Sequence, residues 1–207
     1  MVQEDLEGSD YVLGESKGIV KLIRGTIGGV MGEYILDLGC GGSYSDYKPV
    51  HAMALSYLGA RVVGIDKEGA SDSETYIHIY GNLARERVSE ILGKLENQKF
   101  DAVICSNLFN SPAWFEAVED APNWEDEIIK GICKETYDLL VDGGVFIIPS
   151  LEIGMRLINL ARPYDSVEEA RNLACESESR LLSGCGFEEA ASESGYQAWR
   201  KPSKLPK

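Results

Sequence analysis

Residues 34–42, with the sequence YILDLGCGG, constrain the fold more than any other part of the chain. An apolar run that is typical of a buried strand leads directly into a glycine-rich turn, and the acid Asp37 stands just before the turn. Glycines in such a turn take positive φ at low cost and let the backbone approach a ligand, while the following helix offers unpaired N–H groups. The segment is therefore typical of a nucleotide-binding turn in an α/β fold.

The acid at Asp37 separates two kinds of nucleotide ligand. A phosphate-binding glycine loop relies on N–H groups and on the positive end of a helix, so a carboxylate beside it would repel the anion. The dinucleotide pattern Gly-X-Gly-X-X-Gly also fails, because counting from Gly39 gives Gly41 and then Tyr44 in place of the third glycine. The turn therefore disfavours a pyrophosphate and favours a ligand that carries positive charge.

A second acid, Asp66, follows the next predicted strand at residues 61–65. A carboxylate at this place can accept hydrogen bonds from both hydroxyls of a ribose. The order of acid, glycine turn, helix, strand and terminal acid resembles motif I and the second strand of the class I S-adenosylmethionine-dependent methyltransferases. Their cofactor carries a sulfonium and an α-ammonium instead of a pyrophosphate.

The resemblance implies that the chain binds S-adenosylmethionine. After the third strand, Asn82 and Leu83 hold the positions where family members place a polar group for adenine and an apolar neighbour, although Asn82 is also a good helix cap. Two other roles stay open: Asp37 either caps a helix or faces solvent, and Asp66 is only an acid at the end of a strand. The implied cofactor-binding residues are Asp37, Gly39, Cys40, Gly41, Gly42, Asp66, Lys67, Asn82, Leu83, Ser106 and Asn107.

Short apolar runs alternate with helical patterns from residue 34 onward, which predicts parallel strands joined by crossover helices. The polar segment 67–75 leaves room for at most a very short helix between the second and third strands. We expect strands at 34–38, 61–65, 76–80, 100–105 and 145–149, and helices at about 48–59, 83–96, 123–140 and 151–162.

The end of the chain supports the same family, because residues 181–200 have the pattern helix, strand, turn, strand. Class I methyltransferases end with an antiparallel strand inserted into the sheet, whereas dinucleotide dehydrogenases do not. The predicted fold class is α/β, with a doubly wound, mostly parallel seven-stranded sheet and an antiparallel C-terminal strand. We expect an N-terminal helical segment at 1–30, a cofactor-binding domain at 31–200 and a tail at 201–207.

The candidates for the methyl-transfer step are His51, Asn107, Asn110 and Tyr44. His51 stands at the start of the first crossover helix, and imidazole can act as a base near neutral pH. Asn107 and Asn110 follow strand four, where amino-directed nucleic-acid methyltransferases carry an Asn/Asp-Pro-Pro-aromatic signature that this chain lacks. Tyr44 lies with Tyr47 in the lengthened loop 43–49, where the two rings either close around the sulfonium by cation–π contact or face solvent.

Composition limits the substrates and the compartment. A chain of 207 residues with 44% hydrophobic residues fits one globular domain. A net charge of -14 repels phosphate backbones, so a nucleic-acid acceptor is disfavoured.

The five cysteines are spread without a Cys-X-X-Cys pattern, and neither a secretory signal nor a long apolar segment is present, so we expect a cytoplasmic protein. No group of side chains has the spacing of metal ligands, so no metal is expected.

The sequence thus predicts an S-adenosylmethionine-dependent methyltransferase that acts on a small molecule or a protein. One alternative is a cofactor-binding or scaffold protein of the same fold without turnover, which Ser43 in place of the usual third glycine and the short second crossover support. An RNA methyltransferase and a nicotinamide dehydrogenase are weaker alternatives, because the charge opposes the first and Asp37 opposes the second.

Overall fold

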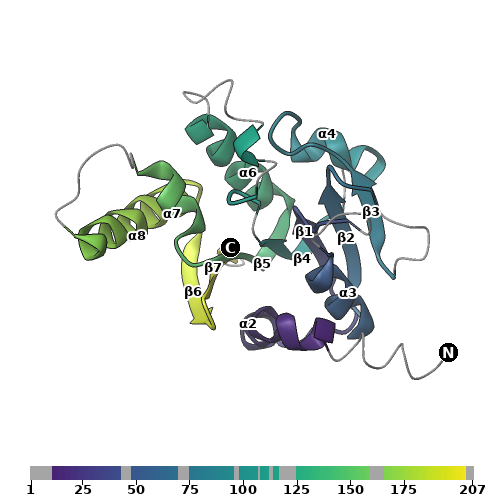
Figure 1. Ribbon diagram of the computed structural model, residues 1–207. Helices are drawn as coiled ribbons and strands as arrows, with labels where there is room; N and C mark the ends of the chain where they lie inside the picture. The colour runs from purple at the N-terminus through teal and green to yellow at the C-terminus, as the bar shows by residue number, and fades with distance from the viewer. Residues whose placement is uncertain are drawn as a thin grey trace.

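The chain folds around one twisted mixed sheet, which we describe from a computed structural model (Figure 1). The structure describes residues 11–42, 48–69, 75–95, 98–106, 108–111, 114–116, 125–158 and 166–203. Within these residues the sheet has seven strands in the order β3-β2-β1-β4-β5-β7-β6. The strands are β1 (Tyr34–Leu38), β2 (Arg61–Asp66), β3 (Ile77–Tyr80), β4 (Phe100–Cys105), β5 (Leu140–Pro149), β6 (Glu188–Glu193) and β7 (Tyr196–Arg200).

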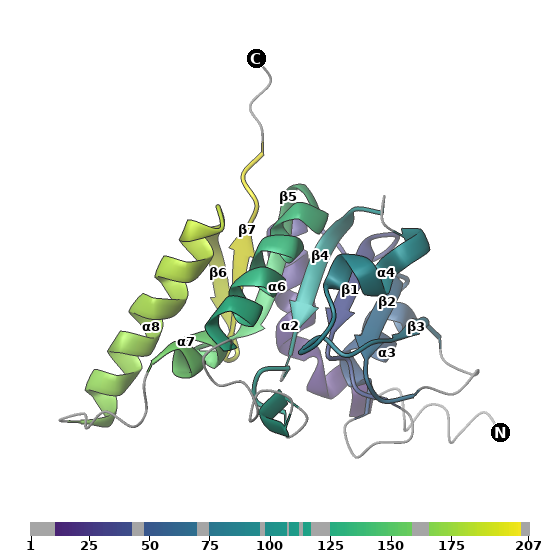
Figure 2. The same cartoon turned by 90° about the horizontal axis from the view of Figure 1, so that it is seen from above.

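The first five strands run parallel, and β7 lies antiparallel between β5 and β6. Figure 2 shows β3 at one edge of the sheet and the β6–β7 hairpin towards the other, beside α8 (Val167–Gly184). The predicted fold class is therefore confirmed, including the antiparallel strand inserted near the end of the chain.

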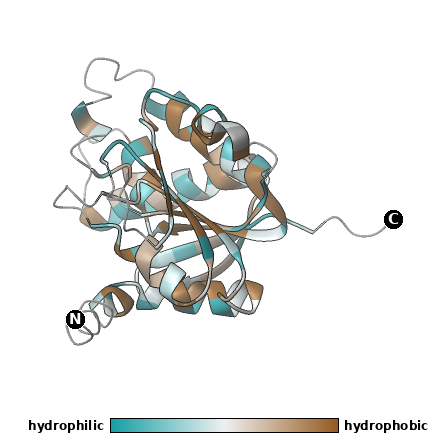
Figure 3. Ribbon diagram, turned by 90° about the vertical axis from the view of Figure 1, so that its right-hand side faces the viewer, coloured by the Kyte–Doolittle hydropathy of each residue, from teal (hydrophilic) through white to brown (hydrophobic). Residues whose placement is uncertain are grey.

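Strands β1 and β4 are apolar along almost their whole length because both faces of the sheet are covered. Successive residues point to opposite faces, so Ile35 packs into one core and Leu36 into the other. In Figure 3 the hydrophobic strands lie between helices above and below them. A sheet buried in this way leaves only its strand ends and the following loops for a ligand.

The helices divide between the two faces of the sheet (Figure 1). On one face, α2 (Lys17–Ile27) and α3 (Val50–Tyr57) pack in the core that contains Ile35. On the other face, α4 (Val88–Leu92), α6 (Glu125–Leu139), α7 (Glu152–Leu157) and α8 pack in the core that contains Leu36. None of the described helices is long and apolar enough to cross a membrane.

Helix α2 contacts β5, β6 and β7, so the beginning of the described chain packs against its end. Lys21 forms an ion pair with Glu193 of β6 at 2.9 Å, and Arg200 of β7 donates a hydrogen bond to the carbonyl oxygen of Thr26 at 2.9 Å. Gly28 ends the helix with φ of +92°, a left-handed conformation that glycine adopts without strain. The limits of the expected N-terminal segment, domain and tail stay predictions.

The structure corrects the expected helix at 83–96, because α4 begins only at Val88 and is followed by a 3₁₀ turn, Gly93–Leu95. A separate turn precedes α4 and uses its own hydrogen bonds. The N–H of Ala84 donates to Oδ1 of Asn82 at 3.1 Å, and the N–H of Glu86 donates to the carbonyl oxygen of Asn82 at 2.8 Å. The backbone of Arg87 is extended, with φ of −73° and ψ of +143°, so this turn does not continue into α4.

Strand β5 begins at Leu140, five residues before the predicted start at Val145. Phe100 of β4 pairs with Leu140 and Ala102 pairs with Val145, so the extra residues of β5 form an irregularity in the pairing. Gly143 within it has φ of +84°, and its N–H donates to the carbonyl oxygen of Lys201 at 2.9 Å. Gly143 therefore lies inside β5, in the part of the strand that precedes the predicted range 145–149.

Helices α7 and α8 approach each other closely at Gly154. A Cβ at this position would overlap the carbonyl oxygen of Ala174 in α8. Glu178 of α8 accepts hydrogen bonds from the backbone N–H groups of Leu151 and Gly154, at 3.3 Å and 3.0 Å, and so caps the start of α7. Only α7 lies within the predicted helix 151–162, and residues 159–165 are outside the described part of the chain.

Candidate functional site

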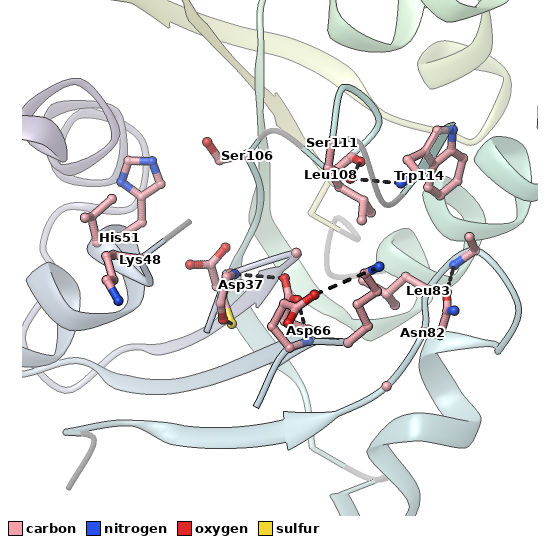
Figure 4. A pocket seen from close by; sticks show the side chains of 18 of the residues that line it. Asp37, Lys48, His51, Asp66, Asn82, Leu83, Ser106, Leu108, Ser111 and Trp114 are labelled. Atoms are coloured by element: carbon pink, nitrogen blue, oxygen red, sulfur yellow. Dashed lines mark hydrogen bonds and ion pairs between the residues drawn. The ribbon is translucent and has the colours of Figure 1, made fainter. Parts of the chain in front are cut away.

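A cavity of about 490 Å³ opens at the carboxyl ends of β1, β2, β3 and β4 (Figure 4). This volume lies within the range of about 300–1,000 Å³ that is usual for small-molecule sites. Strand β1 lies between β2 and β4, where the strand order reverses, and open α/β sheets bind ligands at this place. The lining residues are Tyr11, Asp37, Gly39, Cys40, Gly41, Lys48, Val50, His51, Asp66, Lys67, Glu68, Gly81, Asn82, Leu83, Ala84, Ser106, Leu108, Ser111, Trp114 and Glu116.

The turn after β1 needs its glycines for two separate reasons. Gly39 and Gly41 have φ of +73° and +84°, which other residues adopt only with strain. A Cβ at Gly39 would also lie 3.1 Å from the side chain of Leu108. At Gly42 a Cβ would lie 2.6 Å from the carbonyl oxygen of Gly69, so this residue is required for packing behind the cavity wall.

Asp66 shapes the turn as well as lining the cavity. Its Oδ2 accepts a hydrogen bond from the N–H of Gly41 at 2.8 Å, and its Oδ1 accepts one from the N–H of Glu68 at 2.8 Å. A carboxylate oxygen has two lone pairs, so both oxygens retain the capacity to accept a further hydrogen bond. Asp66 can therefore hold the turn and bind a diol at the same time.

Asp37 is a buried acid without an ordinary hydrogen-bond partner. Asp37 is 1% exposed, and neither carboxylate oxygen accepts a hydrogen bond of ordinary distance and angle from the residues that the structure describes, although the N–H of Ala52 interacts with it weakly. Burial and, to a lesser extent, the charge of Asp66 raise the pKa of Asp37 to about 7, and the backbone N–H of Ala52 in α3 lowers this pKa only in part. An orphaned carboxylate in a cavity wall requires an explanation, and a cationic ligand supplies one.

Asn82 and Leu83 both line the cavity, after β3. The side chain of Asn82 caps the turn that follows, through the hydrogen bond from Ala84, which is one of the two roles its residue type suggested. Leu83 is 4% exposed and belongs to the core beside α4. The cavity end near β3 thus offers an apolar wall next to a polar turn.

The structure brings some of the predicted transfer residues to the cavity and leaves others away from it. His51 lines the cavity at the start of α3 and is buried, and its Nδ1 lies 2.9 Å from Oγ of Ser16. Burial lowers the pKa of His51 to about 4. Asn110 is exposed and is not among the lining residues. Tyr44, Tyr47 and Asn107 lie outside the described residues.

Among the predicted cofactor residues, Ser106 and Lys67 also line the cavity, whereas Gly42 does not. Cys40 lines it with a buried thiol, whose pKa burial raises well above its ordinary value, so this thiol is not a nucleophile at neutral pH. No group of three His, Cys, Asp or Glu side chains is placed to hold a metal ion in the part of the chain that the structure describes.

Sequence reasoning missed Trp114, which forms part of the cavity wall after β4. Its Nε1 donates a hydrogen bond to Oε1 of Glu125 at 2.9 Å, and Nε of Arg156 donates to the same oxygen at 2.7 Å. The ring also packs edge-on against Phe109, with 4.8 Å between centroids. The aromatic pair Trp114-Phe115 in a polar segment was the available signal, but its partners in α6 and α7 are distant in sequence.

Solved structures resemble this chain in fold. A search of protein-family models finds no match, and no curated protein matches the chain. The magnesium protoporphyrin IX methyltransferase of Synechocystis PCC 6803 with bound SAH has a TM-score of 0.51 at 15% identity, over 99% of this chain and 88% of that chain. The MycE methyltransferase of the mycinamycin biosynthetic pathway, in complex with Mg, SAH and mycinamycin VI, has a TM-score of 0.57 at 11% identity.

The chain has the class I methyltransferase fold. The match to MycE covers 91% of this chain and 50% of MycE, so the chain spans about half of that protein. At such low identities the similarity concerns the class I fold, and the chemistry has to be argued from the cavity itself.

Proposed function

We propose that this chain is an S-adenosylmethionine-dependent methyltransferase that acts on a small molecule or a protein. The observation that carries the proposal is the buried, orphaned carboxylate of Asp37, in one cavity with the glycine turn and Asp66. A cavity with this acid disfavours a pyrophosphate and suits a ligand that combines a ribose with positive charge.

Several residues of the cavity have the chemistry that this cofactor requires. Asp66 would accept hydrogen bonds from the ribose hydroxyls, since both of its oxygens keep a free lone pair. Leu83, Leu108 and Trp114 supply apolar surface for an adenine ring. Asp37 would face the positive charge, and Gly39 lets the backbone come close. When bound, the cofactor supplies a methyl group on a sulfonium that is already activated for transfer.

The work left to the protein is to position an acceptor and to exclude water. The net charge of -14 opposes the approach of a phosphodiester backbone, so an RNA acceptor is the weaker alternative. The fold neighbours named above include one protein in complex with the small molecule mycinamycin VI. All five cysteines are free thiols, which fits the reducing cytoplasm that we propose as its compartment.

The test is calorimetry of the purified chain with S-adenosylmethionine and with S-adenosylhomocysteine, followed by a search for S-adenosylhomocysteine production over pools of small molecules and proteins. We expect both compounds to bind and NADH not to bind. Absence of binding at millimolar cofactor would reject the proposal. Binding without turnover on any pool would favour the scaffold protein of the same fold.

A further inference from the structure

A buried contact joins the N-terminal helix to the cavity. Ser16 stands just before α2 and is 0% exposed, and His51 belongs to the first turn of α3. The Oγ of Ser16 lies 2.9 Å from Nδ1 of His51 and 3.2 Å from the carbonyl oxygen of Val50. The edge of the His51 ring also packs on Tyr196 of β7, with 6.2 Å between centroids and an interplanar angle of 89°. The position of the imidazole is therefore fixed from two sides.

Ser16 makes two polar contacts, and both can be hydrogen bonds only if the protons are placed in one particular way. The carbonyl oxygen of Val50 can only accept, so the single hydroxyl proton of Ser16 must go to it. The contact with His51 then requires Nδ1–H to donate to the hydroxyl oxygen. A neutral imidazole carries one proton, so Nε2 is left bare, as a hydrogen-bond acceptor.

The bare nitrogen belongs to a residue that lines the cavity. Nε2 has no hydrogen-bond partner within the described part of the chain, and Nδ1 is turned towards Ser16. In Figure 4, His51 and Lys48 lie on one side of the pocket, Leu83 and Trp114 lie on the other, and Asp37 lies between His51 and Asp66. Burial also keeps the ring of His51 neutral at neutral pH. The end of the cavity opposite the apolar wall thus presents two acceptors, the carboxylate of Asp37 and the imidazole of His51, beside the ammonium of Lys48.

We propose that Ser16 is a positioning residue that holds His51 in the tautomer with a bare Nε2, and that this nitrogen and Asp37 together accept hydrogen bonds from an ammonium group of the bound molecule. An ammonium group has three N–H donors and no acceptor, so the other tautomer would turn a donor towards it. The identity of the ligand rests on the proposed function, because the ammonium is that of the cofactor's amino-acid end. The tautomer itself does not depend on that function.

The tautomer can be read directly by NMR of the whole chain with ¹⁵N-labelled imidazoles. The protein has two histidines, so the spectrum contains only His51 and His78, and His51→Gln assigns them. We expect the His51 Nε2 resonance to be that of an unprotonated nitrogen and Nδ1 that of a protonated one. Ser16→Thr keeps the hydroxyl and should keep this pattern, whereas Ser16→Ala should mix the two tautomers. A protonated Nε2 in the unaltered protein would overturn the inference.

The second part of the proposal, that Nε2 of His51 and Asp37 bind an ammonium group, we call the ligand half. It is tested with S-adenosylhomocysteine and with 5′-methylthioadenosine, which lacks the amino-acid end. We expect the first to shift the Nε2 resonance and the second to bind without shifting it. Ser16→Ala should weaken S-adenosylhomocysteine binding about three- to tenfold, the loss of one hydrogen bond, and leave 5′-methylthioadenosine binding within about twofold. The matched control is Ser179→Ala on the exposed face of α8, which should change neither affinity.

The outcomes separate this inference from the proposed function. Binding of S-adenosylhomocysteine that leaves Nε2 unshifted, or that is equally tight in Ser16→Ala, overturns the ligand half and leaves the methyltransferase proposal standing. Failure of both compounds to bind overturns the proposed function and the ligand half together, while the tautomer in the free protein still decides the role of Ser16.

Discussion

The carboxylate of Asp66 accepts a hydrogen bond from the backbone N–H of Gly41 at 2.8 Å, which ties the end of β2 to the turn after β1. A second hydrogen bond, from the N–H of Glu68, holds the other carboxylate oxygen. The acid is thus fixed in place before any ligand arrives. A preformed acceptor of this kind loses little conformational freedom when it binds a ribose.

Replacing Asp66 should weaken binding more than it weakens the fold. In Asp66→Ala we expect the affinity for S-adenosylmethionine to fall by about 100-fold, since two hydrogen bonds to a charged acceptor are lost. The free energy of unfolding should fall by about 1–3 kcal/mol, because the N–H of Gly41 loses its partner. Calorimetry and urea unfolding measure the two effects, and an unchanged affinity would contradict the assigned role.

Asp37 should make the free protein less stable as the pH rises. Its pKa in the folded protein is about 7, against an ordinary value of 3.8, so the folded state binds the proton more tightly than the unfolded chain. The contribution of Asp37 to the free energy of unfolding is therefore fully present below about pH 4 and is lost as the pH rises through about 7. Asp37→Asn removes the titration, so the variant should be more stable than the unaltered protein at pH 8, by up to about 4 kcal/mol.

Urea unfolding at pH 5 and pH 8 measures this difference. The matched control is Asp138→Asn, which removes the same charge from an exposed position of α6. The control should show almost the same pH dependence as the unaltered protein. A variant Asp37→Asn that is no more stable than the unaltered protein at pH 8 would mean that the carboxylate has a partner after all.

Binding of S-adenosylmethionine should release a proton from Asp37. A cation favours the ionised carboxylate, so the pKa of Asp37 falls in the complex, and the affinity rises as the pH increases through about 7. We expect a gain of about three- to tenfold between pH 6 and pH 8. Calorimetry at pH 6.5 in two buffers of different ionisation enthalpy counts the released protons. The release should disappear in Asp37→Asn, and its persistence there would assign the proton to another group.

Two glycines in helices should respond in opposite ways to alanine. Gly154→Ala should destabilise the fold by about 3 kcal/mol, because the new methyl group meets the backbone of Ala174, which cannot rotate away. Gly131 of α6 has open space where its Cβ would stand, so Gly131→Ala should stabilise by about 0.5–1 kcal/mol. Thermal unfolding of both variants is the measurement. Equal effects would show that α7 and α8 can separate without cost.

The sequence alone was enough for the order of strands and for the turn after β1. These features depend on local causes. The period of the apolar residues distinguishes a strand from a helix, and glycine at positions 39 and 41 is the residue type that adopts positive φ without strain. The β6–β7 hairpin followed for the same reason. The late start of α4 was missed because the extended backbone of Arg87 interrupts the helix, whereas the helical pattern of the sequence continues through this position.

The parts of the site that spacing could not reveal depend on contacts between distant segments. Ser16 and His51 are 35 residues apart in sequence, and Trp114 owes its orientation to Glu125 and Arg156 on two different helices. No local pattern marks such partners. Asp37 was identified by its place beside the turn, but its lack of a partner is visible only once α3 and β2 are packed around it.

The packing of α2 against β5, β6 and β7 has a consequence for how the chain is made. A ribosome releases α2 long before the strands that it covers, so the apolar side chains of Ile19 and Ile23 lack part of their packing partners until the hairpin has emerged. Ser16 reaches its place beside His51 only when this docking is complete. Nascent chains that end before β6 should therefore leave α2 accessible to chaperones and proteases. The wall of the cavity that contains His51 should form only after the hairpin has been synthesised.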